Sequence, residues 1–137
     1  MQTARYMRAE EILGEDVPAP GRPVDFSPML GTWFNTDKGT GGLVRMALME
    51  RDGRLILQAF GANPISPQDW GEVPATAYSA GVGSHQGMAF SALYDFGFME
   101  TLLAAYMKSG ILVLDTFNTF KDASGRANYF SREFFHR

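Results

Sequence analysis

The stretch LGTWFNTDKGTGGLVRMALMERDGRLILQAFG, residues 30–61, determines the fold expected for this chain. It contains three apolar segments, 31–35, 43–50 and 54–60, which are separated by polar and glycine-rich turns. The Asp-Gly pair at 52–53 favours a tight β-hairpin turn, because both residue types tolerate a positive φ. The stretch therefore predicts the first three antiparallel strands of a β-meander.

The rest of the chain continues this pattern to the C-terminus. Further strands are expected over 75–79, 88–96, 98–108, 111–120 and 127–135. The apolar residues of 98–108 also fit one face of a helix. A strand is preferred there because it gives an even number of strands, and a closed meander leaves no exposed edge. The predicted fold class is all-β: a closed eight-stranded antiparallel up-and-down barrel over residues 30–137.

Residues 1–29 differ in composition and are expected to form an N-terminal arm. The segment ARYMRAEEIL at 4–13 is compatible with a short helix. The segment that follows contains Pro18, Pro20, Pro23 and Pro28, which exclude a helix and favour an extended chain. We expect this arm to lie across the barrel or across a partner subunit.

Bulk composition limits the classes of function. The 137 residues suit one domain, and the net charge of -3 argues against nucleic-acid binding, which needs a concentrated basic surface. The absence of cysteine excludes disulfides, thiolate zinc sites and cysteine nucleophiles. The charged N-terminus does not resemble a signal peptide, and no apolar run has membrane-spanning length. The expectation is a cytoplasmic protein that does not bind membranes.

The sequence contains no strong catalytic or metal-binding motif. His85 and His136 are the only histidines, and neither lies near an acidic cluster with ligand spacing. No metal and no cofactor are therefore predicted.

The Gly-Thr-Trp sequence at 31–33 resembles the Gly-X-Trp signature that lipocalins and their calycin relatives carry in the first strand of a meander. The longer GTWFN sequence, and DTF at 115–117, also resemble strands of the avidin group. This resemblance implies a barrel with an interior ligand cavity and with Trp33 closing the narrow end. It also implies an arginine against Trp33, for which Arg132 or Arg126 is available.

The avidin-like part of the resemblance implies that Asn35 and Thr40 lie at the ligand site. Strand alternation independently places Trp33 and Asn35 on one face. Biotin pockets of the avidin type need several tryptophans, and this chain has two, which argues against biotin as the ligand.

Polar residues that interrupt apolar strands are the remaining candidates, because a buried polar group needs a partner or a ligand. Trp70, in the long connection 61–74, is a candidate cap over the open end. We expect an elongated, mostly apolar cavity beneath this connection. Its expected ligand-binding residues are Trp33, Asn35, Thr40, Gln58, Trp70 and Tyr129.

Three functions are consistent with these features. The first is binding of a small hydrophobic metabolite inside the barrel. The second is a cyclase or isomerase acting on a hydrophobic, polyketide-like or terpenoid-like metabolite, with Asp115 and Tyr94 as the catalytic acid–base residues. The third is an oligomer-forming interaction module. Both faces of several strands are apolar, so we expect a homodimer or higher homo-oligomer built on an outer face.

Overall fold

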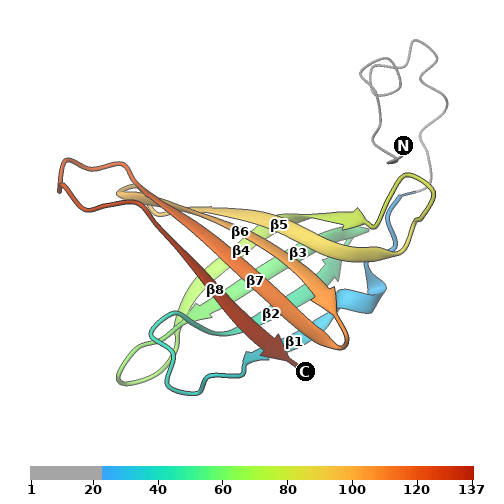
Figure 1. Cartoon of the computed structure of the whole chain (residues 1–137), viewed down its shortest axis with the longest axis horizontal. Helices are drawn as coiled ribbons and strands as arrows, with labels where there is room; N and C mark the ends of the chain where they lie inside the picture. Colours follow the sequence, from blue (N-terminus) through green and yellow to red (C-terminus); the bar gives the residue numbers. More distant parts are fainter. Residues whose placement is uncertain (1–22) are drawn as a thin grey trace, which may run out of the picture.

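The computed structural model describes residues 23–137, which form a closed barrel of eight antiparallel strands in the order β1 to β8 (Figure 1). The predicted fold class is confirmed. The strands are β1 (Gly31–Asn35), β2 (Leu43–Arg51), β3 (Arg54–Gly61), β4 (Gln68–Ser79), β5 (Gly87–Asp95), β6 (Met99–Lys108), β7 (Ile111–Phe120) and β8 (Tyr129–His136). Of the arm predicted over 1–29, residues 1–22 lie outside the described residues. Residues 23–29 are described, and Pro28 lies in a 3-10 helix over Ser27–Met29 where an extended chain was expected.

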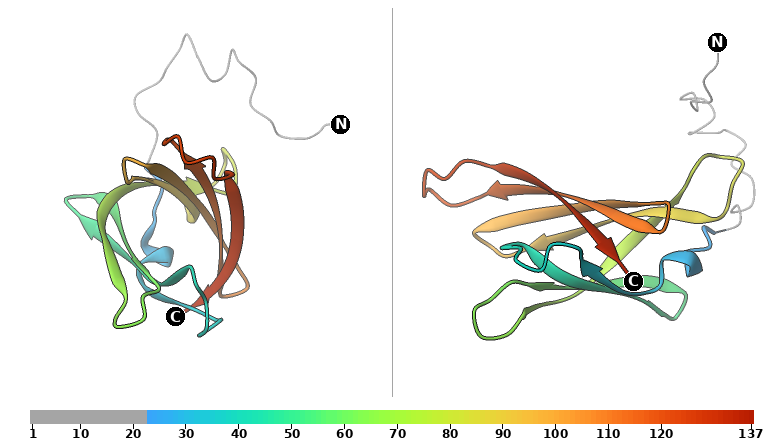
Figure 2. Two further views of the ribbon diagram at one scale, coloured as in Figure 1. Left: turned by 90° about the vertical axis from the view of Figure 1, so that its left-hand side faces the viewer. Right: turned by 60° about the horizontal axis from the view of Figure 1, so that its bottom comes forward.

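The barrel closes because β8 pairs with β1 as well as with β7. The closing pairs are Phe34 with His136 and Asn35 with Phe135. The left view of Figure 2 looks down the barrel and shows the strands forming a ring around the interior. Each strand places alternate side chains inside, as the period of two in β3 illustrates.

Tight turns connect several strands, as their sequences require. Asp52 and Gly53, between β2 and β3, have φ values of 55° and 78°, which confirms the predicted hairpin turn. Ser109 and Gly110 have φ values of 53° and 82° between β6 and β7. Residues 99–108 are a strand that pairs with β5 and β7, so the helical alternative for this segment is excluded.

The strand β4 is longer than the sequence predicts. It begins at Gln68 instead of residue 75, so the connection from β3 is reduced to residues 62–67. Gly71, with φ 88°, lies in a bulge where the register against β3 shifts, and the Asp69 carboxylate accepts a hydrogen bond from its N–H. Pro74 still pairs with Ile56 beyond the bulge. Residues 68–74, which were expected to belong to the connection, are therefore part of a bulged strand.

The end of the barrel that carries both the 3-10 helix η1 (Ser27–Met29) and the C-terminus is plugged. Trp33 is fully buried there, and its indole N–H donates to the Met29 carbonyl at 2.9 Å. The Arg137 guanidinium lies 4.2 Å from the Trp33 ring centroid. An arginine from the C-terminal region thus covers the tryptophan, as expected, although it is neither Arg132 nor Arg126.

The apolar core fills the barrel from the plug toward the middle. Its fully buried large side chains come from seven strands and η1: Met29, Trp33, Leu43, Met46, Leu48, Leu57, Phe90, Leu103, Leu112, Leu114 and Phe135. The residues just before η1 are tied to β5, because Asp25 exchanges backbone hydrogen bonds with His85 and Gly87. No helix within 23–137 is long and apolar enough to cross a bilayer.

Candidate functional site

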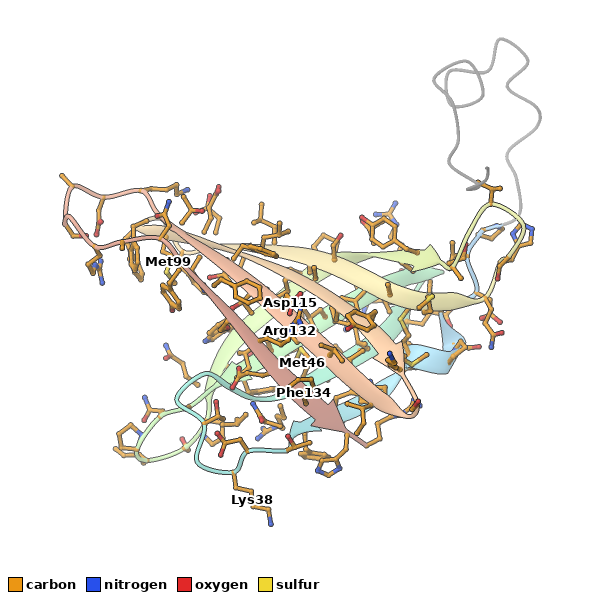
Figure 3. The ribbon with its side chains drawn as sticks, viewed as in Figure 1. Lys38, Met46, Met99, Asp115, Arg132 and Phe134 are labelled. Atoms are coloured by element: carbon orange, nitrogen blue, oxygen red, sulfur yellow. The ribbon has the colours of Figure 1, made fainter. Side chains whose placement is uncertain are left out.

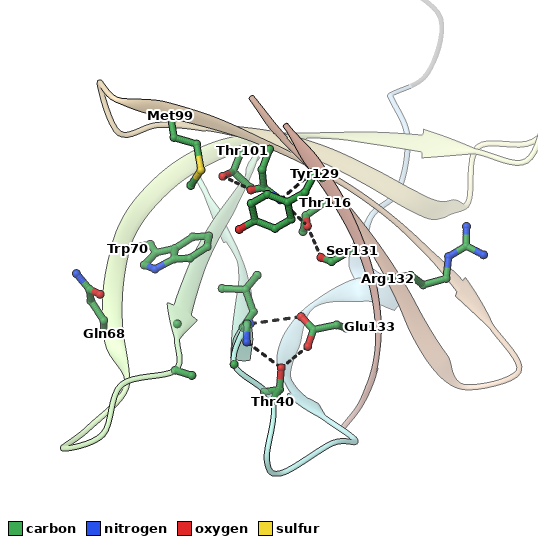
Figure 4. A pocket seen from close by; sticks show the side chains of 16 residues that line it. Thr40, Gln68, Trp70, Met99, Thr101, Thr116, Tyr129, Ser131, Arg132 and Glu133 are labelled. Carbon is green, nitrogen blue, oxygen red and sulfur yellow. Dashed lines mark hydrogen bonds between the residues drawn. The ribbon is translucent and has the colours of Figure 1, made fainter. Parts of the chain in front are cut away.

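A pocket of about 530 Å³ occupies the end of the barrel opposite the Trp33 plug (Figure 4). It lies between the β1–β2 and β3–β4 connections and the ends of β6, β7 and β8. Its lining residues are Thr40, Gly41, Gly42, Leu43, Gly61, Ala62, Gln68, Trp70, Met99, Thr101, Thr116, Asn118, Tyr129, Ser131, Arg132 and Glu133. A volume of this size is typical of small-molecule sites.

One wall of the pocket is a chain of hydrogen bonds across β6, β7 and β8. The Thr101 hydroxyl donates to Asn118 Oδ1 at 2.7 Å, which fixes the orientation of the Asn118 amide. That amide donates from Nδ2 to Thr116 Oγ1 at 3.2 Å and to the Tyr129 carbonyl at 3.3 Å. The Thr116 and Ser131 hydroxyls are hydrogen-bonded to each other.

This network of hydrogen bonds leaves one hydroxyl hydrogen without an acceptor, and that hydrogen is available to a ligand in the pocket. Thr116 and Ser131 carry one hydrogen each, and only one of the two is used in the bond between them. Within the described residues, no other acceptor contacts either hydroxyl. Both residues line the pocket, so the pair presents a hydrogen-bond donor to its interior.

Glu133, two residues further along the inner face of β8, continues the polar wall. Its carboxylate accepts a hydrogen bond from Asn35 Nδ2 at 2.8 Å and another from the Thr40 hydroxyl. The Leu43 N–H approaches Oε1 at 3.4 Å. A Cβ on Gly42 would lie 2.6 Å from Oε1, so glycine leaves room for this carboxylate. Glu133 thereby fastens the β1–β2 connection to β8.

The opposite wall is aromatic. The Trp70 indole makes edge-on contacts with Tyr94 and Phe96 at centroid distances of 5.3 and 5.1 Å. A Cβ on Gly61 would come within 2.7 Å of Trp70 Nε1, so the indole lies directly over this glycine. Trp70 therefore lines the pocket and does not cap it as a mobile lid would. Figure 4 shows the indole across the pocket from Ser131 and Glu133, with Met99 above the indole.

Tyr94 lies behind Trp70, and its hydroxyl is fully engaged with the backbone. It accepts from the Ala59 N–H at 3.0 Å and donates to the Gly71 carbonyl at 2.7 Å. Burial raises the pKa of Tyr94 to about 12. These contacts join β5 to the bulged part of β4, so Tyr94 supports the aromatic wall instead of presenting a proton to the pocket.

Asp115 and Gln58 are on the outer face, contrary to expectation. The Arg132 guanidinium donates to both oxygens of Asp115, at 2.6 and 2.9 Å, and Figure 3 shows the two side chains beside each other on β7 and β8. These hydrogen bonds hold the pKa of Asp115 below its usual value, whereas acid–base catalysis in an apolar interior requires a raised one. Gln58 bonds to Asp69 on the outside of β3 and β4.

The structure therefore brings together only part of the predicted site. Thr40, Trp70 and Tyr129 line the pocket, and Asn35 lies just behind it as a partner of Glu133. Trp33 is at the other end of the barrel. Five polar residues on the inner face line the pocket but were not predicted as site residues: Thr101, Thr116, Asn118, Ser131 and Glu133.

The cavity is also shorter and more polar than expected. Of the large core side chains, only Leu43 reaches the pocket, because the others fill the plugged half of the barrel. The pocket is thus a short cavity at one end of the barrel and not an elongated, mostly apolar cavity. Among residues 23–137, no three histidine, aspartate or glutamate side chains are grouped so that they could hold a metal ion.

Comparisons with known proteins give no relative for this chain: no family model, no curated protein and no solved structure matches it. The closed eight-stranded architecture is consistent with a calycin-like barrel.

Proposed function

We propose that this protein binds a compact small molecule in the open-end pocket. The ligand has a flat apolar part, which packs against Trp70, and a hydrogen-bond acceptor, which meets the Thr116–Ser131 pair. The observation that carries this proposal is the unused hydroxyl hydrogen of that pair, placed opposite an aromatic wall inside a pocket of about 530 Å³. A few polar groups set among apolar ones are the usual composition of a ligand site.

The polar wall changes the kind of ligand expected from the sequence. A purely hydrophobic metabolite would leave the remaining hydroxyl hydrogen of this pair buried without an acceptor, at a cost of about 1–3 kcal/mol. A carbonyl, ether or ring nitrogen on the ligand removes this cost. The ligand class proposed is therefore amphipathic instead of purely hydrophobic.

The contacts of Glu133 favour binding over acid–base catalysis. Asp115 is outside the barrel and Tyr94 is bonded twice to the backbone, and within the described residues Glu133 is the carboxylate that lines the pocket. Its oxygens already accept hydrogen bonds that anchor the β1–β2 connection. A residue in that role holds the shape of the pocket instead of exchanging protons.

The proposal can be tested with prodan, a flat neutral fluorophore with one carbonyl acceptor and an emission that reports the polarity around it. The wild-type protein is expected to bind prodan with saturation and a blue-shifted emission. Ser131→Trp fills the pocket and should abolish binding. Thr76→Trp adds the same side chain on the exposed face of β4 and should leave binding unchanged.

A second pair of variants examines the hydroxyl donor. Ser131→Ala leaves the Thr116 hydroxyl free to donate, so affinity should change less than about threefold. The double variant Thr116→Val with Ser131→Ala removes both hydroxyls and should weaken prodan binding about tenfold. Equal affinity in the wild type and in Ser131→Trp would contradict the proposed location of the site.

A further inference from the structure

The outer face of β5, β6, β7 and β8 carries a continuous apolar row. Strand register places Leu93 beside Leu102, Leu102 beside Phe117, and Phe117 beside Phe130. These four side chains are 42–51% exposed, and the Phe117 and Phe130 rings are 5.2 Å apart. Soluble monomers rarely leave a large apolar patch uncovered.

A second apolar row runs parallel to the first on the same face. Register places Tyr106 beside Val113 and Val113 beside Phe134. Tyr106 and Phe134 are 37% and 46% exposed. Figure 3 shows Phe134 further along β8 than Arg132, which lies between the two rows.

One ion pair separates the two rows. Asp115 and Arg132 are direct neighbours across β7 and β8, and Arg132 donates to both carboxylate oxygens. Next to them in the same row is Ala104. The face therefore carries one positive and one negative group at its centre, surrounded by apolar side chains.

We infer that this face binds a second copy of the same chain through its β7–β8 part, forming a two-fold symmetric dimer. A two-fold axis between β7 and β8, parallel to both strands, places β7 of one copy over β8 of its partner. Asp115 then lies opposite the partner's Arg132, and Phe117 opposite the partner's Phe130. A two-fold interface must be self-complementary in this way.

The ion pair at the centre of the face favours a second copy of the chain over a lipid surface as its binding partner. An ion pair at the centre of an apolar face is costly against hydrocarbon, where neither group finds a further partner. Against a second copy, each carboxylate gains a second guanidinium and each guanidinium a second carboxylate. This inference goes beyond the small-molecule site, because the face lies on the outside of the strands whose inner face lines the pocket.

Sedimentation velocity of the full chain at micromolar concentration tests the dimer. The wild type should sediment at twice the 15.1 kDa mass of the chain. Phe117→Glu with Phe130→Glu introduces charge into the first row and should shift the protein to monomer. Ile65→Glu is the matched control: its side chain is 94% exposed in the β3–β4 connection, away from this face, so it should remain a dimer.

Charge-reversed variants test the proposed arrangement directly. D115R gives each copy two positive groups at the centre, and R132D gives each copy two negative ones. Each variant alone should be monomeric because like charges then meet across the axis. An equimolar mixture of the two should recover the dimer mass, and circular dichroism should show that both remain folded.

Three outcomes would overturn the inference. They are a monomeric wild type, a dimer that survives Phe117→Glu with Phe130→Glu, and a mixture of D115R and R132D that stays monomeric. A monomeric wild type would leave the face to residues 1–22 of its own chain or to a different protein.

Discussion

The Arg137 guanidinium lies 4.2 Å from the centroid of the Trp33 ring and donates hydrogen bonds to the Pro28 and Leu30 carbonyls, both at 3.0 Å. Through these contacts the last residue of the chain closes the barrel over η1 and the start of β1. The plug leaves the other end as the entrance to the pocket, so the two ends of the barrel have separate roles.

Arg137→Ala should lower the free energy of unfolding by about 1–2 kcal/mol, because it removes a cation–π contact and two charged hydrogen bonds. Urea denaturation measures the change. Arg54→Ala, which removes an exposed arginine beside the β2–β3 turn, is the control and should have little effect. Equal stability of Arg137→Ala and the wild type would show that the plug does not depend on this arginine. Prodan affinity should be the same in both variants.

Tyr94→Phe should cost about 1–3 kcal/mol of stability, because the Ala59 N–H and the Gly71 carbonyl both lose a buried partner. Tyr78→Phe provides the comparison: its hydroxyl bonds Ser91 on the exposed face, so the loss should be below about 0.5 kcal/mol. Guanidinium denaturation of the two variants gives the difference. If both variants lost the same stability, the Tyr94 hydroxyl would not support the aromatic wall.

Much of the fold could be predicted from the sequence, because alternation and turn residues act locally. The Asp52–Gly53 turn follows from these signals. The strand at 99–108 does not, because its apolar residues also fit a helix, and it was predicted from the even number of strands that a closed meander needs. The start of β4 could not be predicted, since Gly71 and Pro74 suggest a loop unless the bulge against β3 is known. A bulge depends on the neighbouring strand, which the local sequence does not contain.

The site was harder to predict because β7 is apolar on both faces. Alternation groups Asp115 with Val113 and Phe117, but it does not tell whether that face or the face of Leu114 and Thr116 points into the barrel. Only the pairing with Arg132 of β8 places it outside. Thr116 and Ser131 carry no distinctive signal, since hydroxyl residues are common in strands of any kind. Glu133 offered the clearest available signal, because it shares the inner face with Tyr129.

Glu133→Gln should lower the free energy of unfolding by about 1–3 kcal/mol. The new amide group would direct N–H bonds toward Asn35 and Thr40, which are themselves donors to Glu133. Thermal and urea denaturation measure the change. Glu100→Gln alters an exposed pair with Lys121 and should change stability by less than about 0.5 kcal/mol. A loss no greater than that of Glu100→Gln would show that the carboxylate does not anchor the β1–β2 connection.

The stability contributed by Asp115 should depend on pH. Hydrogen bonds from Arg132 lower the pKa of this carboxyl in the folded state, so its ionised form stabilises the fold above the unfolded-state pKa of about 4. At pH 7, Asp115→Asn should be less stable than the wild type by about 0.5–1 kcal/mol. This difference should shrink as the pH falls below about 5 and toward the folded-state pKa. Urea denaturation at one protein concentration tests this, and a difference that grows in acid would contradict the sign.

The central claim is that the ligand site is the open-end pocket, and the two tryptophans report on opposite ends of the barrel. A two-dimensional ¹H–¹⁵N spectrum contains one indole N–H signal for each, and Trp70→Phe assigns them. Titration with prodan should shift the Trp70 signal progressively to saturation and leave the Trp33 signal in place. A shift of the Trp33 signal alone, or no shift of either signal at saturating prodan, would contradict the account.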